Sequence, residues 1–308
     1  MKKIITIIIV SVFIGNAVTV AAQPHFGEQG NLHYRDYELL LNPAVAGVAM
    51  QTQLTLGVYK QWTGIEGAPL SEFLSFQTPL VQNNGLGAWV HNNSYGVTDH
   101  LQAGAAYAYQ IRLKNNYLSF GLSLSALMLY ESRVMDLNDA NDPVFAKPLD
   151  SQFGFNAGFG LYYSGDKFYA GLSIPQLLTN EIKDNHLGNN FDFARLQYYF
   201  IGGYRFDLTN RVSLSPAALL QLSGTTRPGY EFMFTAAYDR KVELGAGWAS
   251  PAQLQVSAGV AITKQLLLRY QFSQGAGSDY RAGSSHFIVV RLAWGERKVA
   301  PSVATDTN

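Results

Sequence analysis

Residues that could carry out chemistry are few in this chain, and none has a catalytic spacing. The 308 residues include no Cys, which excludes a thiol nucleophile, a Cys-ligated zinc site and a disulfide framework. No two of the six His stand at the i, i+4 spacing of a helical zinc motif. The sequence also has no G-x-S-x-G elbow and no phosphate-binding P-loop. We therefore predict a protein that is not an enzyme and has no cofactor.

Two polar clusters leave alternatives open. His91 and His100 flank a predicted external loop, where a metal site or a catalytic pair would require both, and solvated loop residues are the simpler interpretation. Four aspartates share one long segment: Asp136, Asp139, Asp142 and Asp150. This segment lacks the Gly and the terminal Glu of an EF-hand loop, so calcium binding is the alternative to an ordinary polar loop.

The composition indicates β-structure in contact with lipid. Charged residues make up 14% of the chain, against about 25% in an average soluble domain. Aromatic residues make up 13%, and there are 29 Gly. Lys+Arg and Asp+Glu are balanced at 22 each, which argues against a nucleic-acid binder, because such a protein needs a basic face.

The first segment has the layout of a secretory signal peptide. Two Lys residues precede an apolar run at residues 4–14, and residues 20–22 (Val-Ala-Ala) supply a small-residue cleavage site. The alternative is an uncleaved anchor, but a spanning helix needs about 20 apolar residues and Asn16 interrupts the run. We predict a signal peptide over residues 1–22.

Alternation of bulky apolar residues with small or polar ones recurs about fourteen times between residues 49 and 294. Residues 118–126, for example, read Leu-Ser-Phe-Gly-Leu-Ser-Leu-Ser-Ala. Most of these stretches approach the ~9–11 residues that a tilted strand needs to cross a bilayer. The predicted strands begin near Met50, Ser71, Asn84, His100, Asn116, Gln152, Lys167, Leu196, Asn210, Gly229, Lys241, Gln253, Gln265 and Ser284.

The connections alternate in length, which predicts the fold class. Short turns fall in the even set, and long segments at residues 132–151, 176–195 and 274–285 fall in the odd set. Outer-membrane barrels have short periplasmic turns and longer external loops. We predict an all-β, antiparallel outer-membrane β-barrel of about 14 strands over residues 49–294. The alternative is a soluble β-sandwich or propeller, which also alternates.

Aromatic residues near strand ends favour the membrane barrel, because Tyr and Trp form belts at both membrane interfaces. The candidates for these belts are Tyr59, Trp62, Trp89, Tyr162, Tyr163, Tyr198, Tyr199, Trp248 and Trp294. The polar face of the strands is rich in Gly, Ser, Ala and Gln, which suits a lumen. Its few predicted charges are Lys60, Arg112, Arg205, Arg269 and Arg291.

Two segments flank the predicted barrel. Residues 23–48 contain the turn signal Asn42-Pro43 and form a candidate periplasmic or lumenal segment. Residues 295–308 form a polar C-terminal tail.

Several motifs, taken in order, resemble the PorP/SprF family of type IX secretion membrane proteins from Bacteroidetes. They are Asn42-Pro43-Ala44-Val45-Ala46-Gly47, Tyr59-Lys60-Gln61-Trp62, Gly85-Leu86-Gly87-Ala88, Phe153-Gly154-Phe155-Asn156-Ala157-Gly158, Tyr169-Ala170-Gly171-Leu172-Ser173 and Gly283-Ser284-Ser285-His286. The resemblance covers nearly the whole mature chain. Two positions depart from the family pattern, because Pro24 and Phe287 stand where acidic residues are usual.

The resemblance implies a fourteen-stranded barrel in the outer membrane of a Gram-negative bacterium, without catalysis, that serves type IX secretion. One expected partner is a large secreted adhesin with a type B C-terminal signal, anchored at the surface and often used in gliding motility. The other expected partners are periplasmic, peptidoglycan-binding proteins of the secretion complex. Membrane lipid surrounds the barrel, and no nucleic acid is expected. The alternative function is a diffusion porin or small-solute channel, and an outer-membrane enzyme is the third.

Seven residues are candidates for partner contacts: Asn42, Pro43, Gly47, Lys60, Trp62, Ser285 and His286. Each has a plain structural interpretation as well, such as a turn, an aromatic belt or packing in the lumen. If the barrel closes between its first and last strands, Trp62 and His286 lie near the same external rim. We expect the partner to bind by strand addition or as a docked plug.

Overall fold

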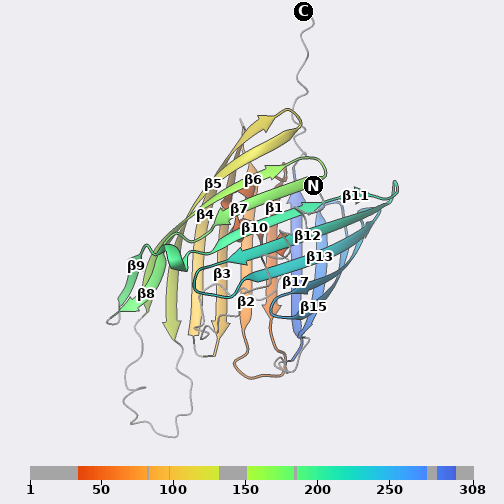
Figure 1. The fold of residues 1–308 in the computed structure, drawn as a ribbon. Helices are drawn as coiled ribbons and strands as arrows, with labels where there is room; N and C mark the ends of the chain where they lie inside the picture. Colours follow the sequence, from red (N-terminus) through yellow and green to blue (C-terminus); the bar gives the residue numbers. More distant parts are fainter. Residues whose placement is uncertain are drawn as a thin grey trace, which may run out of the picture.

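The structure is a computed structural model that describes residues 34–81, 83–96, 98–131, 151–183, 186–275 and 283–295. The predicted signal peptide, the Asp-rich loop at 132–150 and residues 296–308 of the tail lie outside the described residues. Within them, almost every element is a strand (Figure 1). No helix in this part of the chain is long and apolar enough to cross a membrane.

Fourteen strands of the described chain close into an antiparallel barrel, which confirms the predicted fold class. They are β1 (Thr52–Lys60), β2 (Leu70–Pro79), β3 (Asn84–Tyr95), β4 (Thr98–Leu113), β5 (Asn116–Glu131), β6 (Gln152–Ser164), β7 (Phe168–Ile174), β10 (Tyr198–Tyr204), β12 (Val212–Leu222), β13 (Gly229–Tyr238), β14 (Val242–Ala249), β15 (Gln253–Ala261), β16 (Leu266–Gly275) and β17 (Ser285–Trp294). Each begins within two residues of its predicted start. The first strand, β1, pairs with the last, β17, and β10 pairs with β12.

Three short strands were not predicted. The β8 (Thr179–Lys183) and β9 (His186–Asn190) strands form a separate hairpin in the long connection between β7 and β10. The β11 strand (Phe206–Asp207) follows β10 in the chain and, like β10, pairs with β12.

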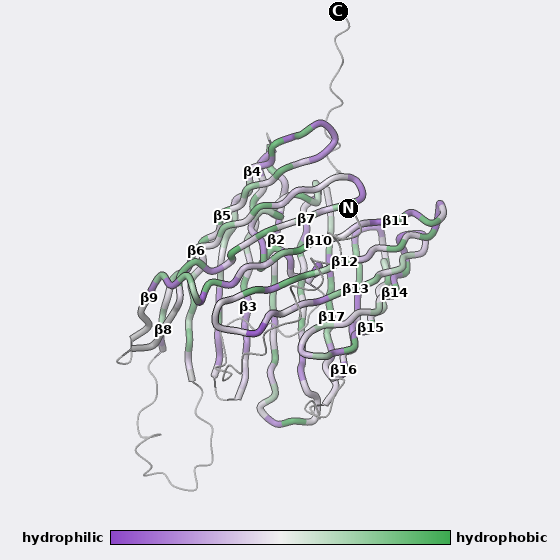
Figure 2. The backbone as a smooth tube through the Cα atoms, in the orientation of Figure 1, coloured by the Kyte–Doolittle hydropathy of each residue, from purple (hydrophilic) through white to green (hydrophobic). Residues whose placement is uncertain are grey.

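Side chains alternate along each strand between the outer and the inner face of the barrel wall. In β5 the apolar set faces outward, where Leu124 is 72% exposed, and the serines between them are buried on the inner face. Successive side chains of a strand point to opposite faces, so apolar positions meet lipid and small polar positions meet the lumen. Figure 2 shows hydrophobic and hydrophilic positions interleaved along the strands.

The predicted aromatic belts are correct in part. Trp248 and Trp294 lie on the outer face and are exposed. Four other members of the predicted set are buried on the inner face, so their assignment to the belts was wrong: Tyr59, Trp89, Tyr162 and Tyr199. Position near a strand end does not fix the direction of a side chain, because one residue of register reverses it.

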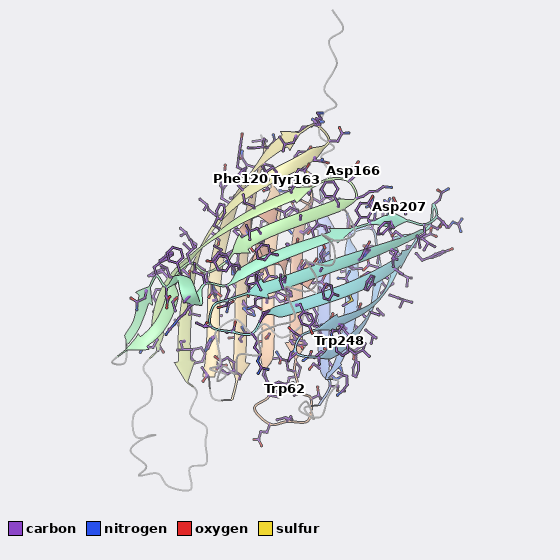
Figure 3. All side chains as sticks on the ribbon, viewed as in Figure 1. Trp62, Phe120, Tyr163, Asp166, Asp207 and Trp248 are labelled. Atoms are coloured by element: carbon purple, nitrogen blue, oxygen red, sulfur yellow. The ribbon has the colours of Figure 1, made fainter. Side chains whose placement is uncertain are left out.

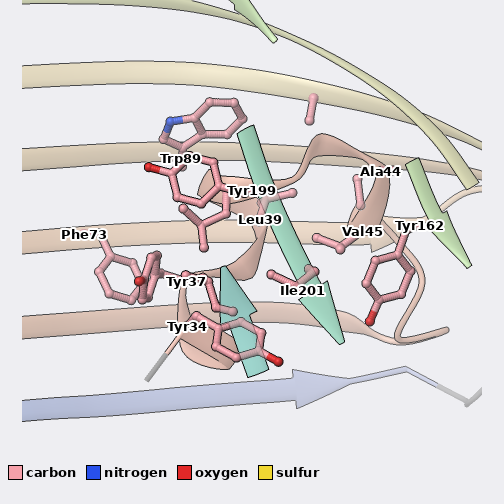
Figure 4. Packing of buried hydrophobic residues seen from close by; sticks show 14 of the residues in the cluster. Tyr34, Tyr37, Leu39, Ala44, Val45, Phe73, Trp89, Tyr162, Tyr199 and Ile201 are labelled. Atoms are coloured by element: carbon pink, nitrogen blue, oxygen red, sulfur yellow. The ribbon is translucent and has the colours of Figure 1, made fainter. Parts of the chain in front are cut away.

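Residues 34–48, which we call the lumenal segment, lie inside the barrel and pack against its wall. They form three short elements: η1 (Tyr34–Asp36), α2 (Glu38–Leu41) and η2 (Pro43–Val45). Inward-facing hydroxyls of the wall hold its backbone, because Ser119 of β5 donates to the carbonyl of Ala44 at 2.6 Å and Ser173 of β7 donates to that of Leu41 at 2.7 Å. Its side chains pack with aromatic residues of the wall (Figure 4).

Glycines on the inner face make room for this segment. A Cβ at Gly121 would meet the backbone of Ala44, and one at Gly85 would meet the carbonyl of Ala46. Gly47 has φ +72°, a left-handed conformation that favours Gly, where the segment turns toward β1. The small residues of the inner face therefore accommodate the chain's own backbone.

Candidate functional site

The seven candidate residues fall into two groups. Asn42, Pro43 and Gly47 lie in the lumenal segment and are buried. The other four lie where β1 meets β17: Lys60, Trp62, Ser285 and His286. Figure 3 shows Trp62 at the opposite end of the barrel from Asp166 and Asp207, which are in or next to short turns.

The Asn42-Pro43 pair forms a turn that is anchored to the wall. The Asn42 Oδ1 atom accepts a hydrogen bond from the Ala44 backbone nitrogen at 2.9 Å and so caps η2, which Pro43 begins. The Asn42 Nδ2 atom donates to the carbonyl of Leu161 in β6 at 3.0 Å. These contacts fix the path of the lumenal segment and leave no surface for a partner.

A buried ion-pair network fastens the other end of the segment. Both Oδ atoms of Asp36 accept from Nη1 of Arg269, at 2.5 and 2.6 Å, and Nη2 of Arg291 donates to Oδ1 at 2.6 Å. The side chain of Asp36 is 0% exposed. Arg269 also donates to Glu243 through Nη2 at 2.5 Å. Charge-assisted hydrogen bonds are stronger than bonds between neutral groups, so they hold η1 against β16 and β17.

A second set of contacts holds η1 against the opposite wall. The Arg35 Nη1 atom donates to Glu38 Oε2 at 2.6 Å, and the Arg35 guanidinium lies 4.1 Å from the ring centre of Tyr169 in β7. Tyr34 and Tyr169 share a hydrogen bond between their hydroxyls at 2.5 Å. Burial raises the pKa of the Glu38 carboxyl, and the nearby Arg35 charge opposes that rise.

At the rim, the pairing of β1 with β17 places Lys60 directly opposite His286. The Trp62 backbone nitrogen donates to Ser285 Oγ at 3.2 Å, so Trp62 and His286 share one rim as predicted. The predicted lumenal position of Lys60 was wrong, because its parity in β1 is that of outward-facing Leu56 and Val58. Its ammonium group instead donates to the carbonyl of Ala68 at 2.8 Å.

His286 also lies on the outer face, within the aromatic belt. Its Nδ1 is 2.7 Å from the hydroxyl of Tyr270, and its Nε2 is 3.2 Å from Ser284 Oγ. The ring of Phe272 contacts it edge to face. Ser285, the next residue, points into the lumen and is buried. The side chains of Ser285 and His286 therefore lie on opposite faces of the wall.

Comparison with known proteins agrees with this geometry. Residues 28–292 match the sequence profile of the type IX secretion system membrane protein PorP/SprF. The chain belongs to the PorP/SprF family. It is therefore a membrane component of type IX secretion, located in the outer membrane of a Gram-negative bacterium. No curated protein matches the chain.

Solved structures share the fold of this PorP/SprF-family barrel. The toluene transporter TbuX of Ralstonia pickettii has 12% sequence identity and a TM-score of 0.53, over 84% of this chain and 94% of that one. The monoaromatic hydrocarbon channel CymD has 12% identity and a TM-score of 0.52, over 85% of this chain and 94% of that one. At this identity the likeness shows the barrel fold alone.

His91 and His100 of this PorP/SprF-family barrel are not loop residues, which corrects the sequence prediction. The β3 and β4 strands pair up to Tyr95 and Thr98, so the expected external loop is a tight hairpin. Both His side chains are buried on the inner face, and the hydroxyl of Tyr95 lies 2.7 Å from Nε2 of His100. In the described part of the chain, no group of three or more His, Asp or Glu residues could hold a metal ion.

Sequence reasoning missed Asp36, which is the centre of the ion-pair network. The inward position of Arg269 and Arg291 was predicted from strand alternation, and it is correct. Two inward arginines on what became adjacent strands were a signal that a buried carboxylate must lie near them, because unpaired buried charges are very unfavourable. That signal could not choose Asp36 among the other acidic residues.

Proposed function

We propose that this PorP/SprF-family barrel is a non-enzymatic scaffold that binds a secreted partner protein and holds it at the cell surface. The observation that carries this proposal is the lumenal segment, which occupies the interior and is fastened by the ion pairs of Asp36. A diffusion porin needs a water-filled path. With the chain itself occupying part of the interior, the rims and the edges of the wall are the surfaces best placed to bind a partner.

A large surface adhesin with a type B C-terminal signal is the partner that this arrangement favours. The end of the barrel with the longer connections presents exposed apolar residues that a protein can cover. Phe191 and Phe193 form an edge-to-face pair there, and Phe193 is 71% exposed. Ile65, in the loop after Trp62, is exposed at the same end. Aromatic and large apolar residues are typical anchors of protein interfaces.

A small-solute channel is the second candidate function. The observation in its favour is the name of the two structural neighbours, which are a toluene transporter and a hydrocarbon channel. For this function a solute would have to pass the lumenal segment, which the ion pairs of Asp36 hold in place.

The test is affinity purification of the tagged protein from outer membranes in mild detergent, with mass spectrometry of the co-purified proteins. We expect an adhesin at near-stoichiometric level from the unmodified protein and a loss of most of it with Trp62→Ala. Trp248→Ala is the matched control, because Trp248 lies on the outer wall in β14. An isolated barrel that conducts in planar bilayers would overturn the proposal and favour the channel.

A further inference from the structure

The wall of the barrel has an incomplete edge along β6. One edge of β6 pairs with β5 from Gln152 to Ser164, but the other edge pairs with β7 only from Phe159 to Ser164. Among the described residues, no strand pairs with residues 153–158 along this second edge. The β9 strand lies close to β6, but its ladder is with β8 alone. At about 3.3 Å per residue, the gap extends over roughly 20 Å.

The gap exists because the chain leaves the wall after β7. Pro175 follows the last residue of β7 and has no backbone N–H to continue a ladder. The chain then crosses the inner side of β6, where a Cβ at Gly158 would lie 2.5 Å from the Pro175 carbonyl oxygen. Asn156, which faces inward, bonds both the backbone nitrogen and the carbonyl of Leu178, at 3.0 and 2.7 Å.

This crossing supplies hydrogen-bond partners for the backbone of Ala157 but none for the backbones of Phe155 and Phe153. The carbonyl of Ala157 accepts from the Leu177 nitrogen at 2.8 Å, and the Ala157 nitrogen donates to the Asn156 side chain at 2.9 Å. The backbone groups of alternate residues point to the same edge, so those of Phe155 and Phe153 also point into the gap. Within the described chain, no backbone or side-chain group bonds them.

The open edge is flanked by outward-facing apolar side chains of β5 and β6. Phe155 and Phe153 stand opposite Ala126 and Met128 of β5, and Tyr130 lies beyond these toward the rim. Both phenylalanines face outward, with 59% and 53% of their surface exposed, and their rings meet edge to face at 4.8 Å. Apolar surroundings offer no hydrogen bonds, so an open strand edge among these side chains is unfavourable unless another backbone covers it.

We propose that the β6 edge at Phe153–Ala157 receives an extended strand of the secreted partner by strand addition. This proposal rests on the proposed function and names the surface through which it operates. A strand is the occupant that matches the edge, because it offers donors and acceptors in the alternation that the edge presents. An apolar small molecule would cover the phenylalanine rings but would leave the backbone groups without partners.

The test compares Phe155→Pro with Phe155→Ala in the tagged, full-length protein. Both variants lose the ring, but only proline loses the N–H that points into the gap. The β5–β6 ladder stays intact, because Phe155 directs its backbone groups away from β5. We expect Phe155→Pro to reduce the co-purified partner at least tenfold, and Phe155→Ala to keep it within about twofold of the unmodified protein. Heat-modifiable gel mobility verifies that each barrel is folded.

The outcomes separate this proposal from the proposed function. Full partner recovery with Phe155→Pro would refute strand addition and leave partner binding intact. Equal loss in both variants would assign the effect to the ring and also refute it. If the unmodified protein recovers no partner, the proposed function itself fails.

A second measurement applies if Phe155→Pro does not fold. A photo-reactive phenylalanine analogue is placed at Phe153, and at Leu124 as the control, since both face outward and β5 is paired on both edges. Strand addition predicts a cross-link from position 153 to a terminal strand of the partner, and none from position 124. Cross-links of equal yield from both positions, or to lipid alone, would refute it.

Discussion

Replacing Asp36 by Asn tests whether the ion-pair network keeps the lumenal segment in place. Asn keeps the shape of the side chain but removes its charge. Arg269 retains Glu243, whereas Arg291 loses the carboxylate that it contacts at 2.6 Å. Asp36 is fully buried, and the Arg269 and Arg291 side chains are 8% and 23% exposed. Removing one partner from a buried pair typically costs about 3–5 kcal/mol.

This cost translates into a large change in how often the segment is released. At about 1.4 kcal/mol per factor of ten, the population of released segment should rise by roughly 100-fold or more. The chain has no Cys, so a single Cys placed at Val45 reports release without background. Val45 is buried in the unmodified protein, and a smaller Cys side chain fits its site.

The assay is the rate at which a water-soluble maleimide labels Val45→Cys, with and without Asp36→Asn. We expect at least a 100-fold faster rate with Asp36→Asn. Asp207→Asn is the matched control, because its ion pairs with Lys167 and Arg205 are exposed at a short turn and solvent screens them. Equal labelling rates in all three proteins would refute the reasoning that Asp36 holds the segment.

Three further predictions follow from the same contacts. Gly121→Ala should displace the lumenal segment and lower stability by about 1–3 kcal/mol, seen as a lower temperature of the gel-mobility transition. Gly202→Ala is its control, because a Cβ there meets only an ordinary contact at 3.6 Å, and equal transition temperatures would contradict the prediction. Because burial raises the pKa of Glu38, the docked segment binds that proton more tightly than the released one does. Docking should therefore weaken as the pH rises through the raised pKa, and maleimide should then label Val45→Cys faster. Adding Glu38→Gln should remove this part of the pH dependence of the labelling rate. Ser285→Ala removes the acceptor of the Trp62 N–H, which is worth about 1 kcal/mol, so hydrogen exchange at that amide should be about fivefold faster. A rate unchanged from that of the unmodified protein would contradict it.

The barrel itself was predictable because its signals are local. Alternation in a strand such as residues 118–126 depends only on the two-residue period of the backbone and on lipid outside the wall. The order of short and long connections then fixed the antiparallel arrangement. The predicted faces of Lys60 and Trp89 were wrong, and both side chains point to the opposite face. A shift of one residue in a strand reverses the face of every side chain, so this assignment is sensitive to a small error in the sequence pattern.

The amino-acid sequence by itself determined the strands, their number and the family. It also determined that Arg269 and Arg291 face inward. The tertiary structure alone decided that Asp36 meets them, because 233 residues separate Asp36 from Arg269 and no local pattern connects the two. It also decided that β7 leaves the wall after Ile174 and opens the edge of β6. Contacts of this kind arise when a closed barrel brings distant strands around one interior, so they depend on the whole register and not on any single segment.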